Sequence, residues 1–486
     1  MLKSKIMRQR YFIFGILIIY FIFNLLIILR HEPWRDELQS WMIGRDSGNV
    51  LEVIYNSRYE GHPRLWYEIQ FILSRFSHNF ILMQLFHLCL ATISVYLILK
   101  YAPFTKWIKI LFIFSYFLTY EYSVLARNYA LGILGLFLIC AFHQQKKIFG
   151  KLLGIFLLCQ SSIFGVIMAL AYLFFNLFNL GKILAKKKTT KFFVPLLITS
   201  FIITNIVLAI WQIIPPVDSG FVVGWTTAYK PEHLQAVISI FWKALIPIPQ
   251  AIFHFWNTNI FDNQPLLMAE LGGGLIILSL LLFQHRSVCF LYLLGILGLL
   301  AFYYTKNIGY LRHQGQIFIW MFACLWLDRI SVTFVVGWRK FLTNILLAGI
   351  LSAQVYAAFY AVIMDWQYPF SGSKQAADFV RKNISHNYPL GADTDYTVSP
   401  IAAYLDKPLY YAVNQKWGTF LLWDQSRLSV DYDRTMHQSE TMRIKTGRSV
   451  GLILSFVPDS KWSVKELFQV KQSIVEDEIY NIYLWF

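Results

Sequence analysis

The chain has 486 residues, of which 57% are hydrophobic and 18% aromatic, while only 14% are charged. A soluble protein carries roughly 25% charged residues, so this composition excludes an ordinary soluble fold. The net charge of +16 could suggest a nucleic-acid partner. Since the Lys and Arg residues gather in short loops between apolar segments, where they orient a membrane protein, we expect no nucleic acid.

Apolar segments long enough to cross a hydrocarbon core of about 30 Å recur along most of the chain. We predict eleven transmembrane helices, at 11–29, 79–99, 107–121, 124–143, 148–160, 162–180, 192–213, 265–284, 288–305, 315–330 and 341–363. Basic clusters fall in alternate loops, near 3–10, 100–109, 146–151, 182–191, 286 and 329–340. The positive-inside rule therefore places the N-terminus in the cytoplasm, and the odd count places the C-terminus outside.

Two features of these segments exclude simpler interpretations. The first segment is too long for the core of a signal peptide and is followed by no small-x-small site, so we expect an uncleaved anchor. The cysteines lie inside apolar segments and imply neither a disulfide framework nor a Cys-based metal site; they are Cys89, Cys140, Cys159, Cys289 and Cys324.

Three extracytoplasmic segments are too long to be mere connections. The loop 30–78 is polar, and the loop 214–264 is rich in Pro and Trp, which predicts interfacial helices that skim the membrane. The stretch 366–486 reads as a soluble domain of mixed α/β type. Its pattern predicts a helix at 373–383, a buried strand at 450–456 and a closing strand at 479–486.

The first outer loop contains the densest polar motif, His31-Glu32-Pro33-Trp34-Arg35-Asp36-Glu37. In a helix beginning near Pro33, Trp34, Leu38, Trp41 and Met42 fall on one stripe. Such a helix would anchor its tryptophans at the lipid headgroups and hold Asp36 on the opposite side, with Glu37 beside the stripe. The alternative is that both acids are ordinary solvated loop residues.

Three further positions carry polar residues that could bind an anion. Glu60 and His62 stand at a helix start made by Gly61 and Pro63, where the His could bond a phosphate or cap the loop. Glu121 and Arg127 lie in the turn between the third and fourth spans, where they could be functional or could simply pair. Arg312, followed by His313, begins the tenth span from outside, where it suits phosphate oxygens or snorkels to headgroups.

The order of these motifs resembles the GT-C superfamily of membrane glycosyltransferases, over about residues 1–365. It is most similar to bacterial relatives of protein O-mannosyltransferases and to the aminoarabinose transferase acting on lipid A. Residues 60–65 resemble a His-Pro-Pro-Leu segment of the family, residues 126–131 its Ala-Arg-x-Tyr-Ala-Leu segment, and residues 311–313 its basic start of a late span.

Two positions depart from the family pattern. Arg64 replaces the second proline of the first segment, and Ser123-Val124-Leu125 replaces the Ser-Gln-Glu that often precedes Ala-Arg. The second change leaves the turn without its usual acid, for which Glu121 is a possible substitute.

The resemblance implies an inverting transferase that moves a sugar from a polyprenyl-phosphate donor to an extracytoplasmic hydroxyl of a glycan, lipid or protein. Asp36 would act as general base, and Arg312, with His313 or Arg127, would stabilise the departing phosphate. Glu37 and His62 would orient, with Glu60 and Glu121 in support. The loop 214–264 would screen the site from water. We expect no cofactor and no essential metal, because the acids lack the cluster that a divalent ion prefers. The implied location is the inner (plasma) membrane.

Other functions stay open. An oligosaccharide ligase or polymerase would use a larger, diphosphate-linked donor and rely on basic residues of a long outer loop. A transporter or flippase would place broken helices and polar residues at the membrane midplane, often in repeated halves, and no repeat is visible here. A receptor or scaffold would use the domain 366–486 to bind a partner.

Overall fold

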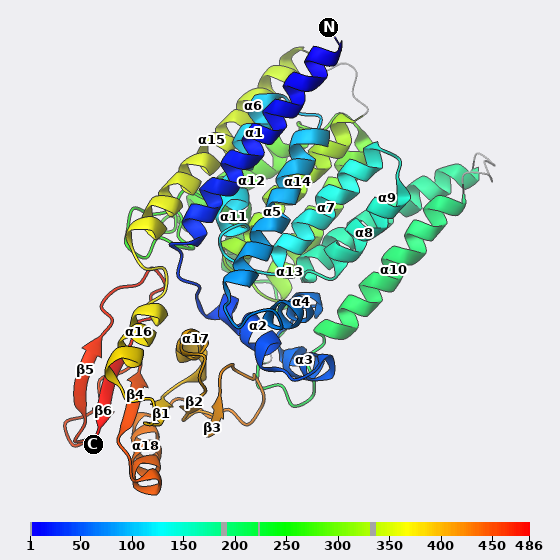
Figure 1. Ribbon diagram of the computed structural model, residues 1–486. Coiled ribbons are helices and arrows are strands. Elements are labelled where there is room, and N and C mark those ends of the chain that lie inside the picture. The colour runs from blue at the N-terminus through cyan, green and yellow to red at the C-terminus, as the bar shows by residue number, and fades with distance from the viewer. Residues whose placement is uncertain (1, 186–191, 222–223, 331–336) are drawn as a thin grey trace.

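The computed structural model describes residues 2–185, 192–221, 224–330 and 337–486 (Figure 1). A bundle of helices forms most of the molecule, with the N-terminus at one end and a small C-terminal domain beside the other. The bundle contains α1 (Leu2–Ile28), α5 (Ile81–Tyr101), α6 (Lys106–Ile113), η2 (Phe117–Glu121), α7 (Tyr129–Gln144), α8 (Ile148–Cys159), α9 (Ile163–Ala185), α10 (Phe193–Ile213), α11 (Pro231–Leu245), α12 (Pro265–Leu280), α13 (Arg286–Thr305), α14 (Leu311–Arg329) and α15 (Gly337–Gln367).

Six of the described helices are long and apolar enough to cross a membrane, namely α5, α9, α10 and α13 together with the apolar parts of α1 and α15. Shorter apolar helices include α7, α8 and α12. The predicted fold class, a mainly helical membrane protein with a C-terminal α/β domain, is confirmed. The count of eleven spans and their sides stay predictions, and the basic clusters at 182–191 and 329–340 lie partly outside the described residues.

The predicted spans 107–121 and 124–143 differ from the helices that form. α6 ends at Ile113, and the chain continues through η2, a single π-helical turn in which the N–H of Tyr122 bonds the carbonyl of Phe117 at 2.9 Å. α7 begins only at Tyr129. The residues between are not helical, and π-turns of this kind often mark functional sites. The non-helical turn that follows η2, at residues 122–128, carries Arg127.

Close packing holds the bundle together. A Cβ on Gly135 would lie 2.5 Å from the carbonyl oxygen of Gly154, so α7 and α8 touch where both residues are glycine. Small residues permit such backbone approach in membranes, where lipid supplies no hydrophobic drive. The rings of Phe112 and Phe322 stack with centroids 4.0 Å apart, which fastens α6 to α14.

The loop 30–78 folds into short helices beneath the bundle: α2 (Arg35–Asp46), α3 (Val50–Asn56), η1 (Ser57–Tyr59) and α4 (Leu65–Ser74). The expectation that α2 anchors its apolar stripe at lipid headgroups is wrong. Leu38 and Met42 are fully buried in the core of the C-terminal domain, and Trp34 and Trp41 in the core of the bundle. An amphipathic helix buries its stripe wherever apolar surface is offered, and here protein offers it on both sides.

The C-terminal domain is a six-stranded mixed sheet with helices. Its order is β3-β2-β1-β4-β6-β5, with β1 parallel to β2 and β4 and the remaining pairs antiparallel. Its elements are α16 (Ser373–Asn383), β1 (Leu390–Ala392), α17 (Asp395–Leu405), β2 (Leu409–Tyr411), β3 (Lys416–Gly418), α18 (Tyr432–Thr446), β4 (Val450–Leu454), β5 (Lys465–Gln469) and β6 (Asn481–Trp485). The predicted helix 373–383 is confirmed, and the two predicted strands form as β4 and β6. The division at 365/366 stays a prediction, since α15 runs two residues past it.

Candidate active site

A cavity of about 320 Å³ opens where the short helices of the first loop meet the bundle and the C-terminal domain. Its polar lining includes three guanidinium groups, on Arg35, Arg127 and Arg312, against two carboxyl groups, on Asp36 and Glu60. The balance is positive, which favours an anionic ligand. Gln39, Ser40, Tyr59, His62, Trp66, Tyr67, Asn128, Phe221, Asn307, His313, Tyr396, Ser399, Leu421 and Trp423 complete the lining.

Asp36 lies between two arginines. Its Oδ2 atom is 2.8 Å from Nη1 of Arg127 and 3.2 Å from Nη2 of Arg312. Burial alone would raise the pKa of Asp36, but Arg127 and Arg312 outweigh it and lower the pKa below its ordinary value. The side chain is 26% exposed, and both arginine contacts use Oδ2 and leave Oδ1 outside them. Asp36 is therefore ionised and held by two arginines in a cavity, so it is not an ordinary solvated loop acid.

Arg312 is held by aromatic rings rather than by headgroups. Its guanidinium carbon lies 5.2 Å from the ring centre of Trp34, 5.7 Å from that of Trp256 and 4.7 Å from that of Tyr310. Its side chain is only 10% exposed. The snorkelling alternative is therefore wrong, and the plane of the guanidinium is fixed toward Asp36.

Glu37 positions the turn that carries Arg127. Its side chain is fully buried and does not line the cavity. Oε1 accepts the backbone N–H of Ala126 at 2.6 Å, and Oε2 accepts that of Trp34 at 3.3 Å. Glu37 thus joins the start of α2 to the residue before Arg127, outside the cavity lining.

A buried histidine links this carboxylate to the last bundle helix. His31 Nε2 lies 3.0 Å from Glu37 Oε2, and Nδ1 lies 2.7 Å from Oδ2 of Asp365 on α15. Burial would lower the pKa of His31, but Asp365 and Glu37 outweigh it and raise the pKa to about 10. The imidazolium therefore bridges two carboxylates, with Tyr120 donating a further hydrogen bond to Asp365 at 3.1 Å.

Glu60 and His62 both line the cavity. Burial raises the pKa of Glu60 to about 7, although its carboxylate accepts hydrogen bonds from Gln39 Nε2 at 2.9 Å and from the Tyr67 hydroxyl at 3.2 Å. Burial and then the charge of Arg127 lower the pKa of His62 to about 3, so its ring is neutral. His62 Nδ1 is buried without a partner among the described residues, so no loop-capping bond involves that nitrogen and it is open to a ligand.

Glu121 and His313 take less direct positions. Glu121 accepts hydrogen bonds from Tyr116 at 2.7 Å and from Trp256 Nε1 at 3.2 Å, so the Glu121–Arg127 pair is wrong and Glu121 instead orients Trp256. His313 lines the cavity and stacks on Phe164, with Nδ1 accepting the backbone N–H of Tyr310 at 3.0 Å. In the neutral ring Nε2 then carries the hydrogen and can donate.

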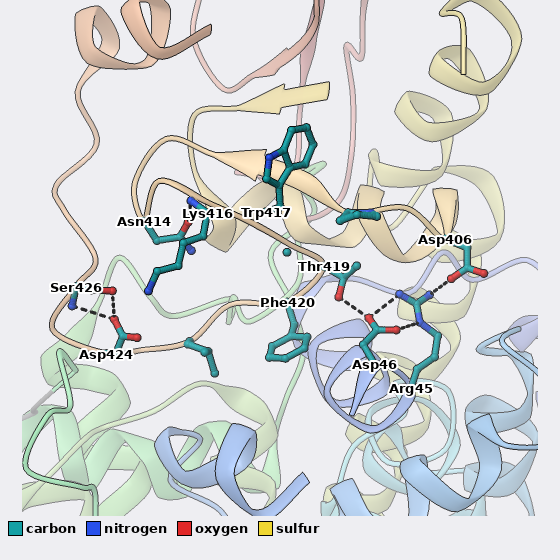
Figure 2. A pocket seen from close by; sticks show the side chains of 13 residues that line it. Arg45, Asp46, Asp406, Asn414, Lys416, Trp417, Thr419, Phe420, Asp424 and Ser426 are labelled. Carbon is teal, nitrogen blue, oxygen red and sulfur yellow. Dashed lines mark hydrogen bonds and ion pairs between the residues drawn. The ribbon is translucent and has the colours of Figure 1, made fainter. Parts of the chain in front are cut away.

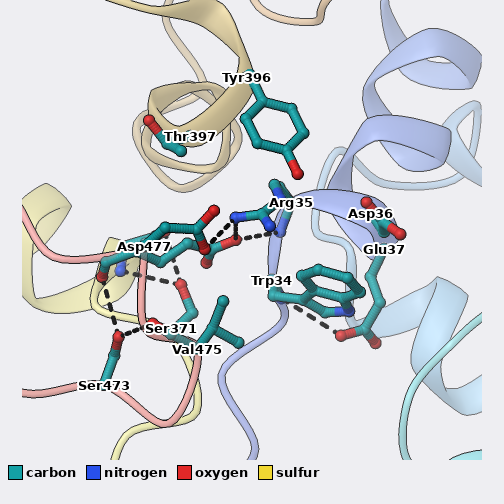
Figure 3. A network of polar contacts seen from close by, with 12 residues as sticks. Trp34, Arg35, Asp36, Glu37, Ser371, Tyr396, Thr397, Ser473, Val475 and Asp477 are labelled. Atoms are coloured by element: carbon teal, nitrogen blue, oxygen red, sulfur yellow. Dashed lines mark hydrogen bonds and ion pairs between the residues drawn. The ribbon is translucent and has the colours of Figure 1, made fainter. Parts of the chain in front are cut away.

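The C-terminal domain lines part of the cavity and contacts the start of α2. Figure 3 shows the polar contacts around Arg35. Arg35 pairs with Asp477 at 2.6 Å and with Glu478 at 3.4 Å, and its backbone N–H donates to Glu478 at 3.1 Å. Figure 3 shows the ring of Tyr396 directed toward Arg35, whose guanidinium carbon lies 4.3 Å from that ring centre. These contacts fix the residue directly before Asp36.

Several of these residues carry no local sequence signal. Tyr396, Ser399, Leu421 and Trp423 reach the cavity from the C-terminal domain, which was not expected to contribute. Asp365 could have been suspected, because an acid at the end of an apolar span is expensive unless paired. Phe221 is the residue that the loop 214–264 contributes to the lining, while Trp256 covers Arg312 from behind. In the part of the chain that the structure describes, no group of three His, Cys, Asp or Glu could hold a metal ion.

Comparisons with known proteins identify two similar solved structures. Both are of ArnT from Cupriavidus metallidurans, and each match covers 97% of this chain and 98% of the other. The crystal structure bound to undecaprenyl phosphate has a TM-score of 0.49 at 10% identity, and the apo crystal structure 0.45 at 13%. ArnT is the lipid A aminoarabinose transferase that the motifs resemble. No protein-family model and no curated protein matches.

Proposed function

We propose that this protein is an inverting glycosyltransferase that moves a sugar from a polyprenyl-phosphate donor to a hydroxyl of an extracytoplasmic acceptor. The observation that carries the proposal is the position of Asp36 between Arg127 and Arg312 in a cavity at one end of the bundle. A carboxylate flanked by two guanidinium groups provides a proton acceptor and an anion site within a few ångströms of each other.

The donor phosphate binds at the two arginines. A guanidinium offers parallel N–H groups that match phosphate oxygens, and Arg312 is pre-oriented by its three aromatic neighbours. As the bond from the anomeric carbon to the phosphate oxygen breaks, its electron pair stays on that oxygen. The added charge is stabilised by groups that are already in place, which is the largest contribution in many enzymes.

The acceptor hydroxyl attacks the anomeric carbon from the opposite side, so the configuration inverts. Its proton passes to Oδ1 of Asp36, which is ionised at neutral pH. The neutral ring of His62, with its unpartnered Nδ1, and the carboxyl of Glu60 hold sugar or acceptor hydroxyls in line. Tyr396 and Trp423 exclude water from the side of the cavity that the C-terminal domain lines.

The test supplies purified protein, reconstituted in lipid, with a panel of polyprenyl-phosphate sugars and follows transfer and slow hydrolysis. We expect one donor to be consumed and its product to have the inverted configuration. Asp36→Asn should lower the rate by about 10²- to 10⁴-fold. Glu52→Gln, which alters an exposed acid of α3 outside the cavity, is the matched control. Full activity in the Asp36→Asn protein would overturn the proposal.

A further inference from the structure

A second hollow of about 460 Å³ lies where the end of α2 meets the segment after β2 (Figure 2). We call it the groove. Its lining comprises Arg45, Asp46, Asp406, Pro408, Asn414, Lys416, Trp417, Gly418, Thr419, Phe420, Leu422, Asp424 and Ser426. None of these residues has a role in the reaction proposed above.

The groove combines an aromatic ring with scattered polar groups. Trp417 is 51% exposed, although Tyr410 packs edge-on against it with ring centres 5.6 Å apart. Lys416 has no ion pair within the described ranges, and Asp424 accepts hydrogen bonds from Ser426 through one oxygen alone. Figure 2 shows Lys416 and Asp424 on the same side of the groove. A free ammonium donor, a free carboxylate oxygen and an exposed indole suit a ring that has hydroxyls on its edge and an apolar face.

Charge argues against an anionic occupant. The lining holds two basic side chains, Arg45 and Lys416, and three acidic ones, Asp46, Asp406 and Asp424. Arg45 is neutralised by Asp46 at 2.6 Å and Asp406 at 2.9 Å. The surface is therefore slightly negative. It would repel a phosphate or an acidic peptide, but it would not repel a neutral saccharide or an amino sugar.

The groove and the active-site cavity share a wall. Residues 420–424, which we call the strap, lie between the two hollows. Phe420, Leu422 and Asp424 line the groove, while Leu421 and Trp423 line the cavity. A ligand in the groove would therefore contact the same segment that lines the cavity.

The strap is bonded to α2 at Leu421. Gln39 donates to the carbonyl of Leu421 at 2.8 Å and accepts the N–H of Leu421 at 3.1 Å. The same Gln39 Nε2 donates to Glu60 at 2.9 Å. At its far end the strap is held by the loop 214–264, where Gly220 donates to the carbonyl of Trp423 at 2.8 Å.

We propose that the groove is a saccharide subsite that binds the glycan part of the acceptor, with Trp417 as its stacking platform. This assignment of the acceptor class rests on the proposed transferase function. It places the glycan on the other side of the strap from the cavity that contains Asp36.

The test uses the full chain in lipid nanodiscs and tetrasaccharides of glucose, mannose and N-acetylglucosamine, with binding followed by ligand-observed NMR. At least one should bind, and Trp417→Ala should weaken it by about tenfold. Trp417→Phe, which keeps a ring, should restore most of the affinity. Tyr432→Ala removes an exposed aromatic ring of the same domain outside the groove and should change nothing.

A second measurement separates the subsite from the reaction. Slow hydrolysis of the polyprenyl-phosphate sugar needs no acceptor, so Trp417→Ala should leave it within twofold of wild type. Absence of saccharide binding, indifference to Trp417→Ala, or an equal loss of hydrolysis would each overturn the subsite. Saccharide binding that depends on Trp417, in a protein that transfers no sugar, would overturn the proposed function and leave the groove as a saccharide site.

Discussion

The carboxylate of Glu37 accepts the backbone N–H of Ala126 at 2.6 Å, across 89 residues of sequence. This bond joins α2, which carries Asp36, to the turn that carries Arg127. The bond joins the residue after Asp36 to the residue before Arg127, so it sets the distance between the two charged side chains. Glu37 therefore acts as a positioning residue.

Replacing Glu37 by Gln tests this role. An amide offers one acceptor oxygen, so either Ala126 or His31 loses its acceptor, and a hydrogen bond to a charged group is worth about 1.5–3 kcal/mol. We expect kcat/KM for the donor to fall between about tenfold and a hundredfold. Because Arg127 shifts while Asp36 keeps its charge, KM for the donor should rise and the pH profile should keep its shape. A variant with normal KM and an altered pH profile would contradict the assignment.

His31 should make stability depend on pH in the alkaline range. Its pKa is raised from 6.5 to about 10 in the folded protein, so the folded state binds the proton more tightly than the unfolded chain. That stability is fully present below pH 6.5 and is lost as the pH rises toward 10. We expect the thermal unfolding temperature in detergent to fall across this window. His31→Gln should be less stable at pH 6.5, because it leaves Glu37 and Asp365 uncompensated, and should show a flatter slope. An unchanged slope in that variant would place the titration elsewhere.

Glu60 should set the acidic limb of the rate profile. Burial raises its pKa to about 7, whereas the pKa of Asp36 is lowered, so only Glu60 of these two carboxyls titrates near neutrality. Both of its oxygens accept hydrogen bonds, which the ionised form does best. Sugar transfer should therefore rise with pH through about 7, and Glu60→Gln should remove that limb. The matched change Glu52→Gln, at an exposed acid, should leave the limb in place. A limb that survives in Glu60→Gln would assign the titration to another group.

Local pattern was sufficient for most of the long apolar helices and for finding the outer motifs, because apolar run length and loop charge are properties of neighbouring residues. It missed the break between α6 and α7. It placed Asp36, Glu60 and His62 in the loop 30–78, Arg127 in a turn between two spans and Arg312 at the start of a late span. The structure brings all five to one cavity. Where that reasoning failed, the deciding partner lay far along the chain. The stripe of α2 suits a membrane surface equally well, and only the C-terminal domain, more than 300 residues away, decides that it is buried.

The same limit explains the incorrect ion pair. Glu121 and Arg127 are six residues apart and of opposite charge, which makes a local pair the simplest expectation. Instead, each residue contacts a partner from another segment. Arg127 pairs with Asp36, and Glu121 accepts a hydrogen bond from Trp256. No spacing rule within the turn contains that information.

The two arginines should respond differently to replacement by lysine. Lys keeps the charge but loses the planar fork and the stacking on rings. Arg312 lies against the rings of Trp34, Trp256 and Tyr310. The guanidinium carbon of Arg127 lies farther, 5.9 Å, from the ring centre of Tyr129. Arg312→Lys should therefore lower kcat/KM for the donor by about 10²- to 10³-fold, as loss of a preorganised donor does, and Arg127→Lys by less. Steady-state kinetics with one polyprenyl-phosphate sugar measures both.

Because Trp256 orients Arg312 and is itself held by Glu121, Trp256→Leu should reproduce part of the Arg312→Lys loss and add little to it in the double variant. Fully additive losses would mean that the ring and the guanidinium act independently, and the aromatic clamp would then have no part in binding the phosphate.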